Sequence, residues 1–179
     1  MSTAVIIVII ILVLVATVLI AASSLDNKYI IERDIVIGRP KAVVFNYIKF
    51  LKNQENYNKW VMADPLMSRE YRGTDGTAGF VYAWDSKNKQ VGKGEQEIKS
   101  IKEGESIGNE IRFVKPFEGT SYAKMTTVTA AANQTKVSWY FSGKRTYAMK
   151  IVHLLFNLKK MLGKDIDTSL ANLKAILEK

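Results

Sequence analysis

Three patterns of hydrophobic and polar residues divide the chain. Residues 4–22, from Ala4 to Ala22, form an apolar run whose one polar interruption is Thr17. Residues 29–142 alternate between apolar and polar side chains in short stretches separated by turn residues. Residues 145–179 repeat apolar side chains at steps of three and four. These patterns are typical of a membrane-length helix, of β-strands and of an amphipathic α-helix, respectively.

The C-terminal pattern predicts one long helix over residues 145–179. Its apolar stripe consists of Ile151, Leu154, Leu155, Leu158, Leu162, Ile166, Leu170, Leu173 and Leu177. Gly163 interrupts the helix at a cost of about 1 kcal/mol relative to alanine, which predicts either a bend or a close contact there. A stripe of this length needs a broad apolar surface to cover it, and the preceding strands supply one.

The middle of the chain reads as a meander of strands. The alternation predicts strands over residues 29–37, 67–71, 79–84, 91–102, 106–114, 120–130 and 135–142, a helix over 41–51 and a helical turn over 56–62. Short turns between successive strands favour antiparallel pairing. The expected fold class is therefore α+β, with a curved antiparallel sheet of about seven strands wrapped around the C-terminal helix.

The apolar run at the N-terminus nearly matches the roughly 20 residues that cross a bilayer as a helix. A cleaved signal peptide is the alternative, and Ala21-Ala22-Ser23 resembles a cleavage site. An uncleaved anchor is favoured because no Lys or Arg precedes the run and because the run exceeds the usual signal core of about 7–15 residues. We therefore expect an anchor over residues 1–22, a linker over 23–28 and one domain over 29–179.

The orientation of this single span follows from the positive charges beside it. Lys28, Arg33, Arg39 and Lys41 come after the run, whereas no basic residue comes before it. Positive charges favour the cytoplasmic side, so the sequence predicts an external N-terminus and a cytoplasmic domain.

Composition narrows the chemistry. The 179 residues include no Cys, one His and a formal net charge of +9. The lack of Cys excludes disulfides and thiolate ligands, and His153 alone makes no His-rich metal site. No metal or cofactor is expected. The positive charge most simply serves solubility. Among anionic partners, lipid head groups are favoured over nucleic acid beside a membrane segment. No nucleic-acid-binding motif appears. Gly92 and Gly94 predict a close strand approach or a bulge rather than a nucleotide loop.

Several separate motifs resemble one superfamily. They are ERDIVIGRPKAVVFNYIKFLKNQENYNKW at the start of the domain, GFVYAWDSKNKQVGKG, FVKPF at Phe113 to Phe117, and the closing strand and helix. Their order resembles the START-like superfamily, also called SRPBCC, over residues 29–179. Within it the chain is most similar to the branch named for polyketide cyclase/dehydrase and lipid transport, which includes many bacterial members with an N-terminal membrane segment.

The resemblance implies a helix-grip fold whose sheet and C-terminal helix enclose a cavity for a lipid or other hydrophobic small molecule. The candidate ligand-binding residues are Arg33, Trp60, Tyr82, Trp84, Gln96, Phe113, Trp139, Phe141, Leu155 and Leu158. The simpler interpretation of the aromatic members is that they fill a solid core, which their large buried area alone would explain. Arg33 either holds a ligand oxygen or pairs with Glu32 or Asp34, and the pair is favoured.

The leading hypothesis for function is a membrane-anchored binding module. One alternative is a cyclase/dehydrase-type enzyme that uses Arg33, Gln96 or a carboxylate that the sequence does not place, because such chemistry needs a positioned acid or base. No catalytic residue is assigned. The other alternative is a protein-interaction module at the membrane. A carboxylate facing the cavity would favour the enzyme, and a closed core would weaken both ligand hypotheses.

Overall fold

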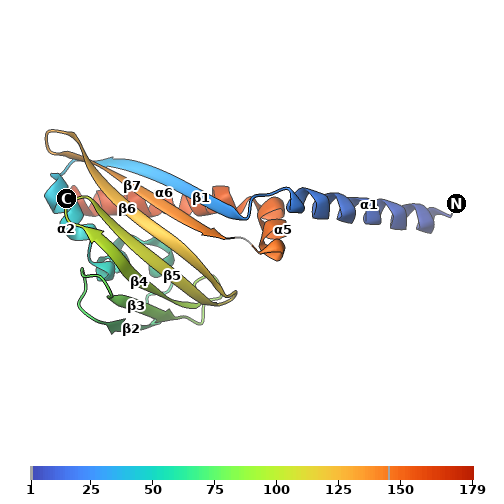
Figure 1. Cartoon of the computed structure of the whole chain (residues 1–179), viewed down its shortest axis with the longest axis horizontal. Coiled ribbons are helices and arrows are strands. Elements are labelled where there is room, and N and C mark those ends of the chain that lie inside the picture. The colour runs from blue at the N-terminus through green and yellow to red at the C-terminus, as the bar shows by residue number, and fades with distance from the viewer. Residues whose placement is uncertain (1, 145) are drawn as a thin grey trace.

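The computed structural model of the chain describes residues 2–144 and 146–179, apart from the side chains of Ala148, His153, Leu155, Phe156 and Leu158. Within these residues an N-terminal helix, α1 (Thr3–Ser23), precedes a curved antiparallel sheet and two C-terminal helices. Figure 1 shows α1 projecting away from the domain.

The sheet confirms the predicted meander. Its seven strands lie in the order β1-β7-β6-β5-β4-β3-β2, and every neighbouring pair is antiparallel. The strands are β1 (Lys28–Ile37), β2 (Ser68–Arg72), β3 (Val81–Asp85), β4 (Lys93–Lys102), β5 (Ser106–Lys115), β6 (Gly119–Ala131) and β7 (Gln134–Lys144). The first strand, β1, pairs with the last strand, β7. The chain therefore returns to the edge of the sheet where it started before the final helices begin.

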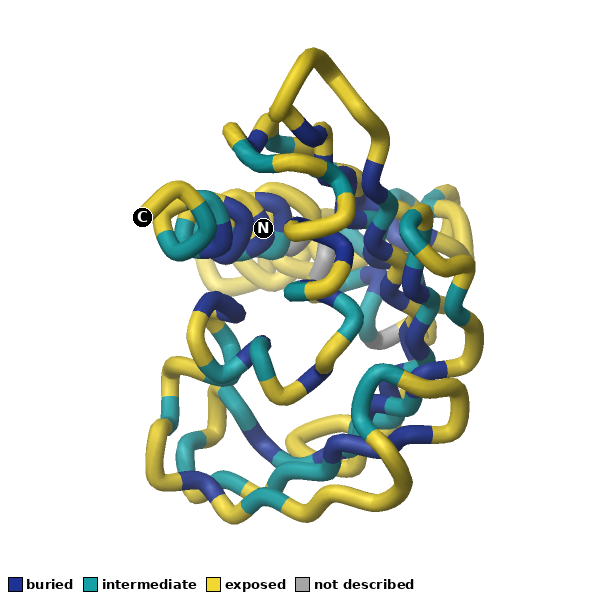
Figure 2. Tube along the Cα trace, turned by 90° about the vertical axis from the view of Figure 1, so that its left-hand side faces the viewer, coloured by how far each residue is buried: buried dark blue, intermediate teal, exposed yellow. Residues whose placement is uncertain are grey.

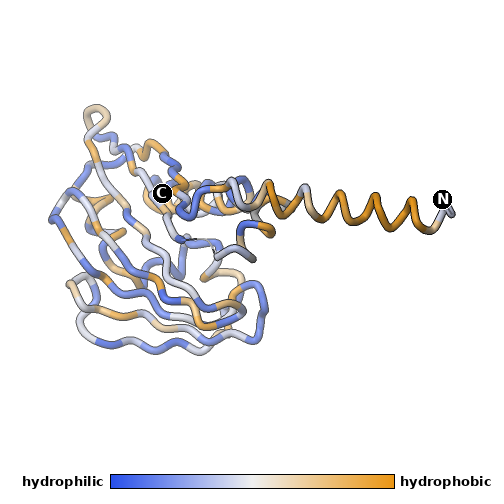
Figure 3. Tube along the Cα trace, turned by 45° about the vertical axis from the view of Figure 1, so that its right-hand side comes forward, coloured by the Kyte–Doolittle hydropathy of each residue, from blue (hydrophilic) through white to orange (hydrophobic). Residues whose placement is uncertain are grey.

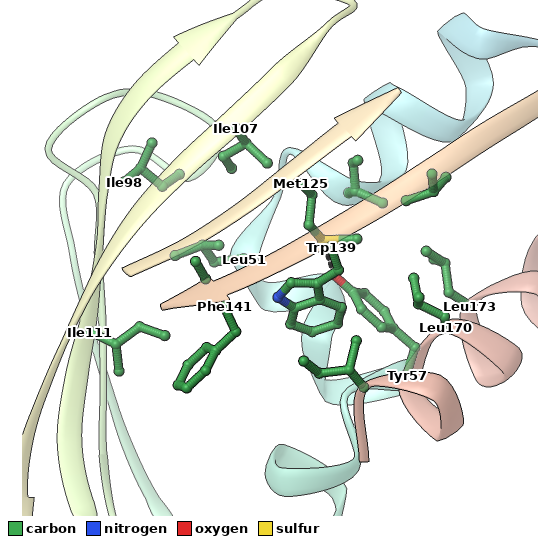
Figure 4. Packing of buried hydrophobic residues seen from close by; sticks show 14 of the residues in the cluster. Leu51, Tyr57, Ile98, Ile107, Ile111, Met125, Trp139, Phe141, Leu170 and Leu173 are labelled. Carbon is green, nitrogen blue, oxygen red and sulfur yellow. Dashed lines mark hydrogen bonds between the residues drawn. The ribbon is translucent and has the colours of Figure 1, made fainter. Parts of the chain in front are cut away.

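The core lies between the concave face of the sheet and the helix α6 (Leu158–Leu177). On β7 the inward residues Val137, Trp139 and Phe141 are buried, as the period of two requires. They pack with side chains of α6 such as Leu170 and Leu173 (Figure 4). Figure 2 shows the sheet curving around α6 with its buried stretches on the inside. The helix-grip prediction is confirmed.

Four short helical segments close the concave side. They are α2 (Lys41–Ile48), the 3₁₀ turn η1 (Leu51–Asn53), α3 (Gln54–Tyr57) and α4 (Lys59–Met62). The side chain of Asn58 caps α4 by accepting a hydrogen bond from the Trp60 N–H at 3.1 Å. This cap places Asn58 and Trp60 over the concave face.

The prediction of one continuous C-terminal helix is wrong. The structure has two helices, α5 (Tyr147–Phe156) and α6, which meet at Asn157. Asn157 adopts a left-handed conformation with φ 45° and ψ 50°, and its side chain accepts a hydrogen bond from the Lys160 N–H at 3.3 Å. Asparagine tolerates this conformation better than other side-chain-bearing residues. Leu154, predicted on the core stripe, is exposed as a result of the turn.

Gly163 marks a close contact rather than a bend. It lies inside α6, where a Cβ atom would stand 2.3 Å from Nη2 of Arg33. Arg33 on β1 therefore crosses the helix where the helix has no side chain. One of the two sequence expectations for this glycine is confirmed.

The helix α1 is apolar on all sides, as Figure 3 shows. Among the described residues it is the one helix long and apolar enough to cross a membrane, and a signal sequence would have the same properties. Its one buried residue is Ala22, near the junction with the domain. The helix therefore contributes nothing to the core of the domain.

Candidate functional site: a cavity between the sheet and the C-terminal helix

A cavity of about 250 Å³ lies between the concave face of the sheet, the short helices and α6. Its lining is mostly apolar and aromatic, as in many small-molecule sites. The lining residues are Gln54, Asn58, Trp60, Val61, Met67, Tyr82, Trp84, Gln90, Val91, Gln96, Ile111, Phe113, Ala123, Trp139, Phe141 and Leu162.

One wall of the cavity is an aromatic cluster. The rings of Trp60 and Trp139 meet edge to face with centroids 6.5 Å apart, and Trp60 lies 6.3 Å from Phe141. Tyr57 supports Trp139 from behind at 6.3 Å. Edge-to-face and tilted pairs at these distances are favourable. Because Trp60 comes from α4 and its partners come from β7, the cluster connects the short helices to the sheet.

A second aromatic pair also lines the cavity. Trp84 and Phe113 meet edge to face at 6.2 Å, and the indole N–H of Trp84 donates to the main-chain oxygen of Val91 at 3.2 Å. At Gly94 a Cβ atom would stand 2.7 Å from the Trp84 ring. At Gly92, with φ 66°, it would stand 2.1 Å from the main-chain oxygen of Lys115. The predicted close approach at both glycines is confirmed.

The polar groups of the cavity fall into two sets. Asn58 Nδ2 donates to Gln54 Oε1 at 2.9 Å, so these two amides bind each other. The indole nitrogen of Trp139 is different, because it is buried and has no hydrogen-bond partner among the described residues. Figure 4 shows it directed away from Tyr57, toward the side of the core where Ile111 and Phe141 lie. Both of those residues line the cavity.

Gln96 adds a second polar side chain at the same wall. It is buried on β4, opposite Tyr82 on β3 and Ile111 on β5. No hydrogen bond joins its amide to another residue in the part of the chain that the structure describes. A fully buried donor without a partner, as at Trp139 Nε1, costs roughly 1–3 kcal/mol. The cavity therefore holds unused hydrogen-bonding capacity.

The described lining contains no Asp, Glu, Lys, Arg or His. Its one titratable group is the phenol of Tyr82, which accepts a hydrogen bond from Arg69 Nε at 3.2 Å. Burial raises the pKa of this phenol above its ordinary value. Acid–base catalysis works best with groups that titrate near the operating pH. Within the described residues, no group of three potential metal ligands is found either.

The structure brings together most of the predicted site residues. Trp60, Tyr82, Trp84, Gln96, Phe113, Trp139 and Phe141 line the cavity. Leu155 and Leu158 have side chains outside the described residues. Whether any of these residues binds a ligand stays a prediction.

Arg33 is placed differently from both sequence interpretations. Its Nε lies 3.2 Å from Oδ2 of Asp167 on α6, and its Nη1 donates to the main-chain oxygen of Glu32 at 2.7 Å. It is absent from the described lining, and the expected side-chain pair with Glu32 or Asp34 is wrong. The residue is inward on β1, but α6 packs directly over this edge of the sheet and supplies the carboxylate.

Sequence reasoning missed several lining residues. Leu162 lies on the predicted apolar stripe and Ile111 lies in a predicted strand, so both could have been added from their periodicity. Gln54 and Asn58 gave no signal, because polar residues in a short helical segment look like a solvated loop. Ala123 gave no signal either. A small side chain leaves room for a cavity, but it does not stand out in a hydrophobic pattern.

The curved antiparallel sheet, the helix packed in its concavity and the apolar cavity between them define a START-like, helix-grip protein. The chain belongs to the family described as "Polyketide cyclase / dehydrase and lipid transport", which matches residues 29–178. No protein among the curated sequences matches the chain.

Solved structures share the fold at low sequence identity. Protein CV1439 from Chromobacterium violaceum is 14% identical, with a TM-score of 0.58 over 86% of this chain and 98% of that one. The Aha1 dimer from Colwellia psychrerythraea is 12% identical, with a TM-score of 0.58 over 84% and 96%. The di-domain ARO/CYC protein BexL from the BE-7585A biosynthetic pathway is 12% identical, with a TM-score of 0.59 over 89% of this chain and 53% of that one. At these identities the likeness concerns the fold alone.

Proposed function

We propose that this protein is a membrane-anchored binding module that holds a neutral, largely apolar small molecule in the cavity between the sheet and α6. One observation carries the proposal: the described lining is apolar and uncharged, yet it contains a buried indole donor, Trp139 Nε1, without a partner. An apolar ligand with one oxygen acceptor would satisfy that donor and fill the space.

The volume limits the size of the ligand. An apolar cavity of roughly 150 Å³ is known to hold benzene. The cavity of about 250 Å³ therefore suits a two-ring molecule or a comparable length of hydrocarbon chain. A complete two-chain lipid is too large for it.

The electrostatics favour a neutral ligand over a carboxylate. Burial of an ion is costly unless a counter-ion accompanies it, and the described lining offers no cation. A carbonyl, ether or hydroxyl oxygen needs only a neutral hydrogen bond, which Trp139 Nε1 and the Gln96 amide are able to give. The same lack of charge gives an enzyme of the cyclase/dehydrase type no acid–base pair among these residues.

Anchoring by α1 gives this binding a location. The helix carries no Asp, Glu, Lys or Arg and has the length of a single bilayer span. Apolar molecules concentrate in membranes, so a tethered cavity samples them at high local concentration. The charge distribution keeps the domain on the cytoplasmic side in this proposal.

The test uses residues 24–179, because α1 contributes no residue to the hydrophobic core cluster. Native mass spectrometry and titration of tryptophan fluorescence would compare two probes, tetralin and its ketone 1-tetralone. We expect both to bind, with the ketone preferred by up to about tenfold, the worth of one neutral hydrogen bond.

Two matched variants assign the preference to one residue. Trp139→Phe should abolish the preference for the ketone and leave tetralin binding. Trp84→Phe should keep the preference, since the Trp84 N–H already donates to Val91. Failure of the wild type to bind either probe would refute the proposal. Equal ketone preference in wild type and Trp139→Phe would remove Trp139 from it.

A further inference from the structure

The helix α5 lies across the end of α1. Figure 1 shows it at the point where α1 joins the domain. The phenol of Tyr147, the first residue of α5, donates a hydrogen bond to the main-chain oxygen of Leu19 at 2.8 Å. Ala22, one turn further along α1, is completely buried. The position of α5 is thus fixed to the last turns of α1.

Three apolar side chains of α5 are exposed, and they lie on more than one side of the helix. Tyr147, Val152 and Leu154 are 48%, 41% and 40% exposed. Met161, in the first turns of α6, is 50% exposed beside them in sequence. Single exposed apolar residues are ordinary, but several on one short helix mark a contact surface.

Positive charges flank this helix. Lys144 precedes α5, and Lys159 and Lys160 follow it, all of them exposed. The sequence has no acidic residue between Glu118 and Asp165. Exposed apolar side chains with neighbouring lysines are the features that hold a helix at the surface of an anionic membrane.

We infer that α5 is an interfacial helix, which lies in the head-group region of the leaflet from which α1 emerges. Its exposed side chains Tyr147, Val152 and Leu154 lie along the two flanks of the helix at the level of the head groups, and the lysines beside it contact lipid phosphates. This inference rests on the proposed anchoring by α1. The inference goes further than anchoring, because α5 adds a second contact with the bilayer. Two contacts define which side of the domain faces the bilayer.

The orientation matters for the cavity. Leu162 lines the cavity and lies one turn after the start of α6, which is about 6 Å along the helix axis. Of the half-exposed lining residues, Phe113 lies near the end of β5 and Val91 lies two residues before the start of β4; Figure 1 shows these strand ends on the same side of the domain as α5. Phe117, between β5 and β6, is 74% exposed there. With α5 at the interface, this side of the cavity faces the bilayer, and an apolar ligand has a short path between the two.

The test uses the full chain in liposomes of phosphatidylcholine and phosphatidylglycerol. The protein has no cysteine, so single cysteines can carry an environment-sensitive fluorophore such as NBD. The labelled variants are Val152→Cys and Leu154→Cys on α5. Val128→Cys is the control, since it is an exposed apolar position, 60% exposed, on β6 at the opposite end of the sheet. Ile10→Cys, in the middle of α1, reports on the anchor itself.

Lipids with a nitroxide at a shallow or a deep position then quench each label according to its depth. We expect shallow nitroxides to quench the labels at 152 and 154 at least threefold more than the label at 128. Deep nitroxides should quench the label at 10. Aqueous iodide should quench the label at 128 most strongly.

The outcomes separate the two proposals. Quenching at 10 without quenching at 152 and 154 would overturn the interfacial helix and leave the anchor intact. Protection of 152 and 154 from both iodide and lipid nitroxides would place protein on α5 and would also overturn it. No lipid quenching at 10 would refute the anchoring, and the interfacial helix with it, whatever the cavity binds.

Discussion

The guanidinium group of Arg33 occupies the place where a side chain at Gly163 would lie. A Cβ atom at Gly163 would stand 2.3 Å from Arg33 Nη2 and 2.8 Å from Cζ. From this position Arg33 reaches Asp167, one turn further along α6. The missing side chain in α6 and the ion pair with β1 are therefore parts of the same contact.

This contact predicts that the two positions are energetically coupled. In an Arg33→Ala background, Gly163→Ala should stabilise the domain by about 1 kcal/mol, the helix preference of alanine over glycine. In the wild type the gain should be smaller, because the new methyl group displaces Arg33 from Asp167. Urea unfolding of the four proteins, followed by circular dichroism, measures the difference. Equal gains in both backgrounds would contradict the contact.

A second prediction concerns Ala123, which lines the cavity from β6. Ala123→Leu should fill much of the space and lower the affinity for 1-tetralone at least tenfold. The domain should stay folded, since the added methylene groups enter a cavity rather than a packed core. Calorimetric titration and urea unfolding measure the two effects. Ala131→Leu, at an exposed position of the same strand, is the control and should leave the affinity unchanged.

A third prediction concerns pH and the outer face of the sheet. Arg112 Nε lies 2.8 Å from Glu95 and its Nη2 lies 2.9 Å from Glu97. The hydrogen bond from Arg112 holds the pKa of Glu95 below its ordinary value. Lys99 first, and then Arg112, hold the pKa of Glu97 below its ordinary value.

Because the folded pKa values are lowered, these carboxylates stabilise the domain above the ordinary glutamate pKa of about 4.3 and lose that contribution as pH falls below it. Arg112→Met should cost about 1 kcal/mol at neutral pH, and the cost should shrink toward pH 3. Urea midpoints across this range give the result. Lys124→Met, which removes an exposed lysine with no ion pair in the described structure, should show no such trend.

A fourth prediction concerns the junction of α5 and α6. Asn157 has a positive φ and also caps α6. Asn157→Ala should destabilise the domain by about 1–2 kcal/mol, because alanine disfavours this conformation and provides no cap. Asn157→Gly should be nearly neutral, because glycine adopts the conformation freely. Thermal unfolding of both variants decides, and an equal loss in the two would show that the backbone conformation is not the cause.

The sequence determined the strands of the domain and the inward set of aromatic residues. Period-two alternation identified the seven strands because one face of each meets the core. The same alternation pointed Tyr82, Trp84, Phe113, Trp139 and Phe141 inward, where they line the cavity. The apolar run of α1 was equally plain, because it depends on composition alone.

The tertiary structure decided three features that the local periodicity of the sequence does not show. The apolar stripe continues from α5 into α6 without a change of period, so the turn at Asn157 is invisible in it. The pairing of Arg33 with Asp167 depends on which helix covers which strand. The unpartnered nitrogen of Trp139 depends on what surrounds the ring on every side. The hydrophobic pattern indicates which way a side chain points. Its ion-pair or hydrogen-bond partner, and any cavity beside it, depend on elements that are distant in the chain.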